Sequence, residues 1–85
     1  MKNRTVLTGK NMIYPQNCYY LIERQTARGN IYGLMITNNK DECCIPGVFE
    51  SAAEAEKFSE MLIENNVSPV HLPDAIDDYM GSNKV

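Results

Sequence analysis

The pattern of hydrophobic and polar positions changes from strand-like to helix-like near the middle of the chain. Three short apolar and aromatic runs come first, at residues 18–25, 31–37 and 42–45. Runs of this length between turn-forming residues are typical of strands. Residues 26–30 and 38–41 have turn composition, and Pro46 and Gly47 end the third run. Because sequential strands with short turns pair with their neighbours, residues 18–48 predict a three-stranded antiparallel β-meander.

The first 17 residues give a weaker signal. Residues 5–8 and 12–14 have strand composition around Gly9 and Lys10, and Pro15 then breaks the pattern. Two alternatives stay open for residues 1–17. They form a weakly structured arm, or they add a short N-terminal strand to the sheet.

Helical periodicity begins after Ser51. Ser51 is a good N-cap with Glu54 three residues on, and Asn65 and Asn66 can close the helix, which predicts residues 51–66. One apolar stripe runs along it: Ala52, Ala55, Phe58, Leu62 and Ile63. Such an amphipathic helix covers one face of a sheet.

A second, shorter helix is predicted near the end of the chain. Pro69 favours an extended segment over residues 67–72, and Pro73 suits the first turn of a helix over residues 73–80. Gly81 then ends this helix, and residues 81–85 form a tail. The sequence therefore predicts one α+β domain over residues 1–85: a meander covered on one face by one helix, plus a short C-terminal helix.

Composition and charge narrow the class of protein. The chain has 85 residues, 44% of them hydrophobic and 22% charged, as in ordinary globular domains. No apolar run approaches the roughly 20 residues that span a bilayer, and no signal peptide is apparent, so we expect a cytoplasmic protein without membrane contact. The net charge of −3 hides a split, because residues 1–40 are basic and residues 41–85 are strongly acidic.

Two segments resemble a known family. They are the strand pair at residues 20–23 and 32–36, and the tail from Ala52 to Tyr79, in which Ser68-Pro-Val-His-Leu72 precedes an acidic helix. Over residues 18–80 the chain is similar to a family of small proteins of unknown function from anaerobic Gram-positive bacteria. The resemblance implies a small cytoplasmic α+β protein and no particular activity. The adjacent Cys43 and Cys44 are not part of the family's pattern.

Candidate chemical groups are few. His71 is the single histidine and lies close in sequence to several aspartates, so it is a possible titratable site. The alternative is that its ring braces the second helix. The cysteines, Cys18, Cys43 and Cys44, lack zinc-ligand spacing and fit reduced, buried positions in a sheet. No catalytic, phosphate-binding or cofactor motif occurs, so we expect no enzyme activity, no cofactor and no metal site.

Protein–protein interaction is the leading functional hypothesis. The predicted strands are apolar on both faces, and one helix can cover only one of them. The candidate surface on the uncovered face consists of Tyr19, Leu21, Ile31 and Met35. We expect a homodimer through this face or an edge strand, or an unidentified protein partner. Alternatively, the second helix and the N-terminal arm cover the face, and the protein is a monomer.

Nucleic-acid binding is the alternative function. Arg24, Arg28 and Lys40 lie at or near the ends of strands that carry tyrosines, so a basic sheet edge could hold phosphates while aromatic rings stack on bases. The acidic balance of the whole chain argues against this hypothesis.

Overall fold

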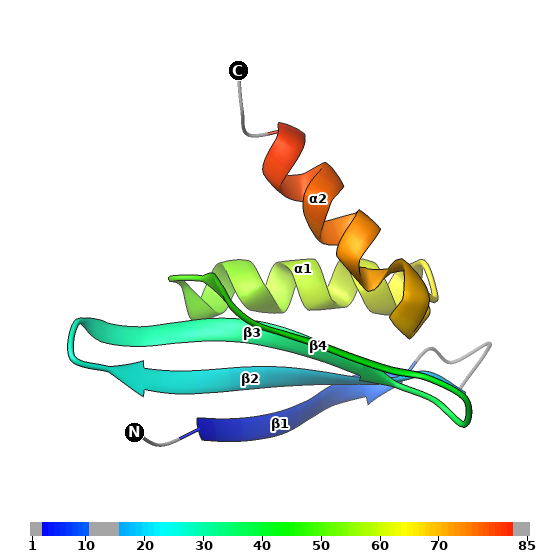
Figure 1. Ribbon diagram of the computed structural model, residues 1–85, viewed down its shortest axis with the longest axis horizontal. Helices are drawn as coiled ribbons and strands as arrows, with labels where there is room; N and C mark the ends of the chain where they lie inside the picture. The colour runs from blue at the N-terminus through cyan, green and yellow to red at the C-terminus, as the bar shows by residue number, and fades with distance from the viewer. Residues whose placement is uncertain (1–2, 11–15, 83–85) are drawn as a thin grey trace.

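Four strands form one antiparallel sheet in the order in which they follow along the chain, β1-β2-β3-β4. The computed structural model describes residues 3–10 and 16–82 (Figure 1). The strands are β1 (Asn3–Lys10), β2 (Cys18–Thr26), β3 (Gly29–Thr37) and β4 (Glu42–Phe49), and the helices are α1 (Ala52–Glu64), the 3₁₀-helix η1 (Pro69–His71) and α2 (Leu72–Ser82). The predicted α+β class is confirmed.

The number of strands differs from the prediction. Residues 3–10 pair with β2 as β1, so the open alternative resolves to an N-terminal strand and the sheet has four strands rather than three. The predicted strand at residues 12–14 lies outside the described residues, as do residues 83–85 of the predicted tail. Between Leu7 and Gly9 the register of β1 shifts by one residue, and Thr8 is the additional residue.

The turn between β2 and β3 is shorter than predicted. Only Ala27 and Arg28 separate the two strands, whereas the composition predicted a turn over residues 26–30. Thr26 Oγ1 donates to the Gly29 carbonyl at 2.6 Å and closes the turn, and Gly29 adopts a φ of +122°. With two residues in the turn, an odd-numbered residue of β2 pairs with an even-numbered residue of β3. This parity decides which side chains share a face of the sheet.

β4 passes through Pro46 and Gly47 instead of ending before them. Tyr32 pairs with Phe49 and Leu34 pairs with Ile45, so β4 has two residues more than β3 over this stretch. The resulting bulge is compatible with Pro46 because β4 is an edge strand, where the missing N–H breaks no internal ladder. The prediction that the strand stops at residue 45 is therefore wrong.

Gly33 of β3 makes room for this bulge. A Cβ atom at position 33 would lie 2.4 Å from both the Ile45 carbonyl oxygen and the Pro46 Cα. Both are backbone atoms of β4, which cannot move aside as a flexible side chain would. The glycine is thus required by the close approach of two strands.

The helices begin and end close to the predicted residues. Ser51 is the N-cap of α1, and its Oγ accepts a hydrogen bond from the Glu54 N–H. Asn66 adopts a left-handed φ of 49° just after α1, as its residue type allows. Of the segment at residues 67–72, which was predicted to be extended, Ser68 is extended, but residues 69–72 form η1 and the start of α2, because Pro69 stands at the first position of a 3₁₀ turn.

Both helices lie on the same side of the sheet (Figure 1). The inner face of the sheet, defined here as the side that faces α1, packs its apolar residues against the helical layer. Ala55, Phe58 and Leu62 of the predicted stripe are buried there. The rest of the buried cluster comes from the strands and from α2: Tyr19, Leu34, Ile36, Phe49, Leu72 and Ile76.

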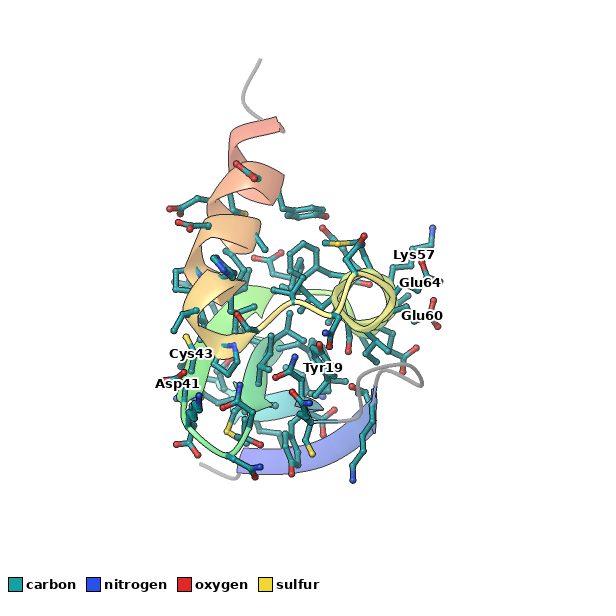
Figure 2. All side chains as sticks on the ribbon, turned by 90° about the vertical axis from the view of Figure 1, so that its right-hand side faces the viewer. Tyr19, Asp41, Cys43, Lys57, Glu60 and Glu64 are labelled. Carbon is teal, nitrogen blue, oxygen red and sulfur yellow. The ribbon has the colours of Figure 1, made fainter. Side chains whose placement is uncertain are left out.

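Tyr19 joins the sheet to the segment that follows α1. Its side chain lies between the sheet and α1 (Figure 2), is 1% exposed, and donates its hydroxyl proton to the Val67 carbonyl at 2.8 Å. A chain of amides runs alongside: Asn38 Nδ2 donates to Asn17 Oδ1 at 3.0 Å, and Asn17 Nδ2 donates to Asn66 Oδ1 at 2.9 Å. These bonds hold the end of α1 against the β2 start and the β3–β4 turn.

Substituting Gly33→Ala is expected to destabilise the protein by about 1–3 kcal/mol, because the new methyl group clashes with backbone atoms of β4. Thr37→Ala, also on β3, is the control and is expected to cost less than about 1 kcal/mol. Chemical denaturation of both variants checks this. Similar midpoints for the two variants would contradict the role of Gly33.

The Tyr19 hydrogen bond predicts a loss of stability at alkaline pH. Burial raises the pKa of Tyr19, the adjacent Cys18 raises it as well, and a hydrogen bond with Asn17 lowers it. As the pH rises, the Tyr19 hydroxyl of the unfolded chain loses its proton before that of the folded chain. The contribution of this hydroxyl to the free energy of unfolding is therefore fully present below about pH 10 and is lost at higher pH. Tyr19→Phe is expected to reduce the free energy of unfolding by about 1–2 kcal/mol at neutral pH, since the Val67 carbonyl loses its donor.

The difference between wild type and Tyr19→Phe is expected to shrink above about pH 10, measured by denaturant titration at several pH values. Tyr20→Phe, on the other face of β2, is the control and keeps the alkaline loss of the wild type. If the difference in free energy of unfolding between wild type and Tyr19→Phe stayed constant with pH, the alkaline loss of stability would not come from ionisation of Tyr19.

Candidate functional site

The outer face of the sheet is the side opposite α1, and no helix in the described part of the chain covers it (Figure 1). Alternation along the strands and the register between them assign its residues. They are Cys18, Tyr20, Ile22 and Arg24 of β2, Ile31, Met35 and Thr37 of β3, and Glu42 and Cys44 of β4. On β2, β3 and β4, apolar side chains therefore make up most of this face.

A central row crosses three strands of the outer face. Tyr20 pairs with Met35, and Met35 pairs with Cys44. Tyr20 and Met35 are half-buried, and Cys44 is exposed. Neighbouring side chains in register pack on one another and form a continuous apolar strip.

Charged groups of opposite sign lie at the two ends of the outer face. Arg24 is near the C-terminal end of β2, and Glu42 begins β4 on the other side of β3. Burial raises the pKa of the Cys44 thiol, and the neighbouring Cys43 and the Glu42 carboxylate raise it further, whereas Arg24 lowers it. Both charges therefore act on the exposed thiol of the central row.

The predicted interaction surface is only partly on one face. Ile31 and Met35 lie on the outer face as defined by the register, but Tyr19 and Leu21 lie on the inner face. Tyr19 is buried in the core, and Leu21 packs against it. The assignment of these two residues to the uncovered face is wrong because of the turn length. A five-residue turn would place Tyr19 and Leu21 on the same face as Ile31 and Met35, whereas the two-residue turn places them on the opposite face. Tyr20 and Ile22 lie on the outer face instead, but Ile22 is only 7% exposed, so Tyr20 is the one that adds to the surface.

The basic residues of the predicted nucleic-acid site do not form one edge. Arg28 is in the β2–β3 turn, and Lys40 is in the β3–β4 turn at the opposite end of the sheet (Figure 1). Arg24 projects from the outer face. Tyr19 and Tyr32 lie on the inner face, and only Tyr20 shares the outer face with Arg24. The arrangement therefore does not gather the three cations, and it leaves one tyrosine on the same face as one of them.

The other candidate groups are spread over the surface. His71 is exposed at the end of η1, where its backbone N–H donates to the Ser68 carbonyl at 3.0 Å. Cys43 is half-buried against the core, and Cys18 is half-buried on the outer face. Within residues 3–10 and 16–82, no group of three or more histidine, cysteine or acidic side chains is placed to hold a metal ion. No helix among those residues is long and apolar enough to cross a membrane.

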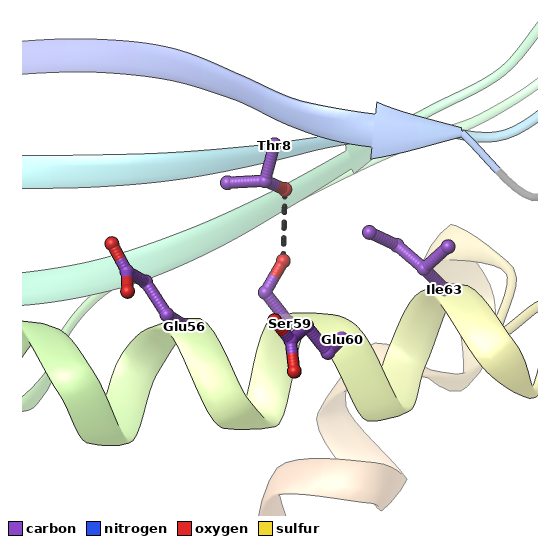
Figure 3. Close-up of a pocket in the computed structure, with 5 residues that line it drawn as sticks. All are labelled: Thr8, Glu56, Ser59, Glu60 and Ile63. Atoms are coloured by element: carbon purple, nitrogen blue, oxygen red, sulfur yellow. Dashed lines mark hydrogen bonds between the residues drawn. The ribbon is translucent and has the colours of Figure 1, made fainter.

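A cavity of about 270 Å³ separates β1 from α1 (Figure 3). Its lining is Thr8, Glu56, Ser59, Glu60 and Ile63. Thr8 Oγ1 donates to the Tyr19 carbonyl at 3.1 Å, so Ser59 Oγ, 2.8 Å away, is the donor to Thr8. Ser59 is 1% exposed, and this bond satisfies its hydroxyl. The two hydroxyl groups therefore join the β1 bulge to α1.

Ser59 was missing from the predicted buried stripe because it is polar. Its position carries a signal nonetheless, since it follows Ala55 by four residues and precedes Leu62 by three. Position alone places it on the buried side of the helix.

Comparison with known proteins gives a family without an assigned role. The sequence model of a family of unknown function, DUF6514, matches residues 1–82. The chain has no significant match among curated proteins or solved structures.

The electrostatics of the outer face predict how fast Cys44 reacts. In a Cys18→Ser/Cys43→Ser background, Glu42→Gln is expected to lower the Cys44 pKa and to speed alkylation by iodoacetamide near pH 8, because the thiolate is the nucleophile. Arg24→Gln is expected to slow it. Mass spectrometry of the modified protein over time gives the rates. Glu64→Gln on α1 removes the same charge and is expected to leave the rate unchanged; an equal acceleration there would contradict the assignment.

Proposed function

The chain belongs to the DUF6514 family of unknown function, and we propose that it acts as a non-catalytic protein-interaction module that pairs with a second copy through its outer face. The observation that carries the proposal is the central row of Tyr20, Met35 and Cys44, on the side of the sheet opposite both helices. Apolar strips of this kind mark contact surfaces.

Size favours self-association. A domain of 85 residues buries only roughly 60–65% of the surface that its unfolded chain exposes. Covering the outer face with a second sheet adds apolar burial without any change inside the protomer. Two sheets packed face to face by their apolar sides form a common arrangement.

The two charges at the ends of the outer face suit a second copy. Arg24 and Glu42 lie on opposite sides of β3 and at opposite ends of the face. A two-fold axis that lies in the plane between two stacked faces, perpendicular to the line from Arg24 to Glu42, places each Arg24 over Glu42 of the second copy. Met35 of β3 then lies near its own counterpart. Isologous contacts are the commonest symmetry of small oligomers.

The thiols of the chain suit a reducing compartment such as the cytoplasm, which we propose as its location. Cys18, Cys43 and Cys44 are all free. Free thiols, one of them exposed on the proposed interface, persist where cellular reductants keep them reduced.

Met35→Lys is expected to weaken self-association at least tenfold, about 1.4 kcal/mol or more, because it places a charge at the centre of the apolar row. Sedimentation equilibrium over a series of concentrations measures the monomer–dimer constant. Met61→Lys is the matched control, since Met61 is exposed on α1, on the other side of the sheet. A wild-type protein that stays monomeric up to about 100 µM would refute the proposal.

A charge exchange tests the geometry without changing the apolar row. Arg24→Glu is expected to weaken the dimer, and the double variant Arg24→Glu/Glu42→Arg is expected to restore it. The two variants are first compared by thermal unfolding, so that a difference in folding is excluded. If the dimer of the double variant is then no tighter than that of the single variant, the two residues do not face each other across the interface.

A further inference from the structure

β1 is the edge of the sheet that can receive a further strand. It pairs with β2 on one side, and no strand of the described chain lies on its other side. From Asn3 to Leu7 the pairing with β2 is regular, so the backbone groups that point away from β2 form an uninterrupted row. At the opposite edge of the sheet, the bulge at Pro46 and Gly47 breaks the corresponding row of β4.

α1 lies along the β1 edge. The hydroxyl oxygens of Thr8 and Ser59 are 2.8 Å apart, and β1 and α1 run in the same direction, so Glu56 lies beside the part of β1 that precedes Thr8 (Figure 3). Glu60 projects from the side of α1 that faces away from α2 (Figure 2). This is the β1 side of the sheet, because η1, which leads into α2, contacts β3 and β4 at the other side.

The charged groups that line the cavity between β1 and α1 are both carboxylates, those of Glu56 and Glu60. Two hydroxyl groups and one isoleucine side chain complete the lining. Within the described part of the chain, neither carboxylate takes part in a hydrogen bond or an ion pair. Lys57 on α1 and Lys10 at the end of β1 are close in sequence, but neither lines the cavity. A segment that lies beside β1 therefore meets negative charge, which attracts basic side chains.

The spacing of the two carboxylates matches that of a strand. Glu56 and Glu60 are four residues apart on one side of α1, which corresponds to about 6 Å along the helix axis. Side chains on one face of a strand repeat every second residue, which corresponds to about 6.8 Å. Because α1 runs along the edge, two basic residues separated by one position can face both carboxylates at once.

We infer that the β1 edge docks an extended basic segment of a partner protein, which joins the sheet as a fifth strand. The backbone of the segment pairs with β1 between Asn3 and Leu7, and its alternate lysine or arginine side chains face Glu56 and Glu60. A second copy of β1 fits less well, because its regular stretch holds one basic residue, Arg4, for two carboxylates.

A synthetic peptide tests this inference. The probe is an eight-residue peptide of threonine and valine with lysine at its third and fifth positions and a terminal tryptophan. The protein contains no tryptophan, so the fluorescence reports the peptide alone. We expect saturable binding with a Kd below about 100 µM at low salt, weakened by added salt.

Control peptides separate the contributions of charge, spacing and backbone. Adjacent lysines point to opposite faces of a strand, so a peptide with this arrangement is expected to bind at least about tenfold more weakly, as is one with glutamates in place of the lysines. Two further peptides carry N-methyl groups on alternate residues, one along each edge of the peptide. Because only one edge pairs with β1, one of these peptides is expected to lose binding and the other to keep it.

Protein variants locate the site. Glu56→Gln/Glu60→Gln is expected to weaken binding at least about tenfold and to reduce its salt dependence. Asp74→Asn/Asp78→Asn is the matched control, since it removes the same charge from two residues four apart on α2 and is expected to leave the affinity unchanged. Met35→Lys on the outer face is also expected to bind the peptide normally. Circular dichroism confirms that each variant is folded.

Three results would overturn the inference. The first is an absence of saturable binding, or equal binding of the peptides with alternate and adjacent lysines. The second is binding that Glu56→Gln/Glu60→Gln leaves intact. The third is a peptide that binds and also dissociates self-associated protein, which would show that a second copy of this chain occupies the β1 edge instead. Loss of self-association in Met35→Lys with peptide binding intact is the result expected when the two surfaces act separately.

Discussion

One hydrogen bond in the core fixes the path of the chain as it leaves α1. The Tyr19 hydroxyl of β2 holds the Val67 carbonyl, three residues beyond the end of α1. Asn17 binds Asn66 beside it, so the chain leaves α1 in a left-handed conformation and at a fixed angle. This angle sets the start of η1, and η1 leads directly into α2. The placement of α2 therefore follows in part from a contact made at the start of the second strand.

Elements with local signals could be predicted from the sequence, and those that depend on distant contacts could not. Ser51 and Asn66 mark the ends of α1 by their own side-chain and backbone preferences. Pro46 gave the wrong end for β4, because a proline is tolerated when its strand is at the edge and Gly33 opposite leaves space. β1 was ambiguous since its partner, β2, decides whether residues 3–10 form a strand.

The outer face was half predictable for a related reason. Apolar residues on both sides of the strands indicated one covered and one uncovered apolar face, but the length of the β2–β3 turn decides which residues of β2 and β3 share a face. Thr26 and Gly29 close a two-residue turn, which puts Tyr20 beside Met35 and sends Tyr19 to the core. The angle between α1 and α2 had no sequence signal, because the two helices meet only in the folded chain.

The bulge in β4 also affects how this protein behaves when crowded with copies of itself. An edge strand with free N–H and C=O groups is a template on which further sheets can grow into fibres. Pro46 offers no N–H at that edge, and Gly47, with a φ of 73°, turns the backbone out of the extended line. Growth of a continuous intermolecular sheet along β4 is therefore interrupted at its middle. Selection for solubility can thus act on Pro46 and Gly47, the two residues for which Gly33 leaves space.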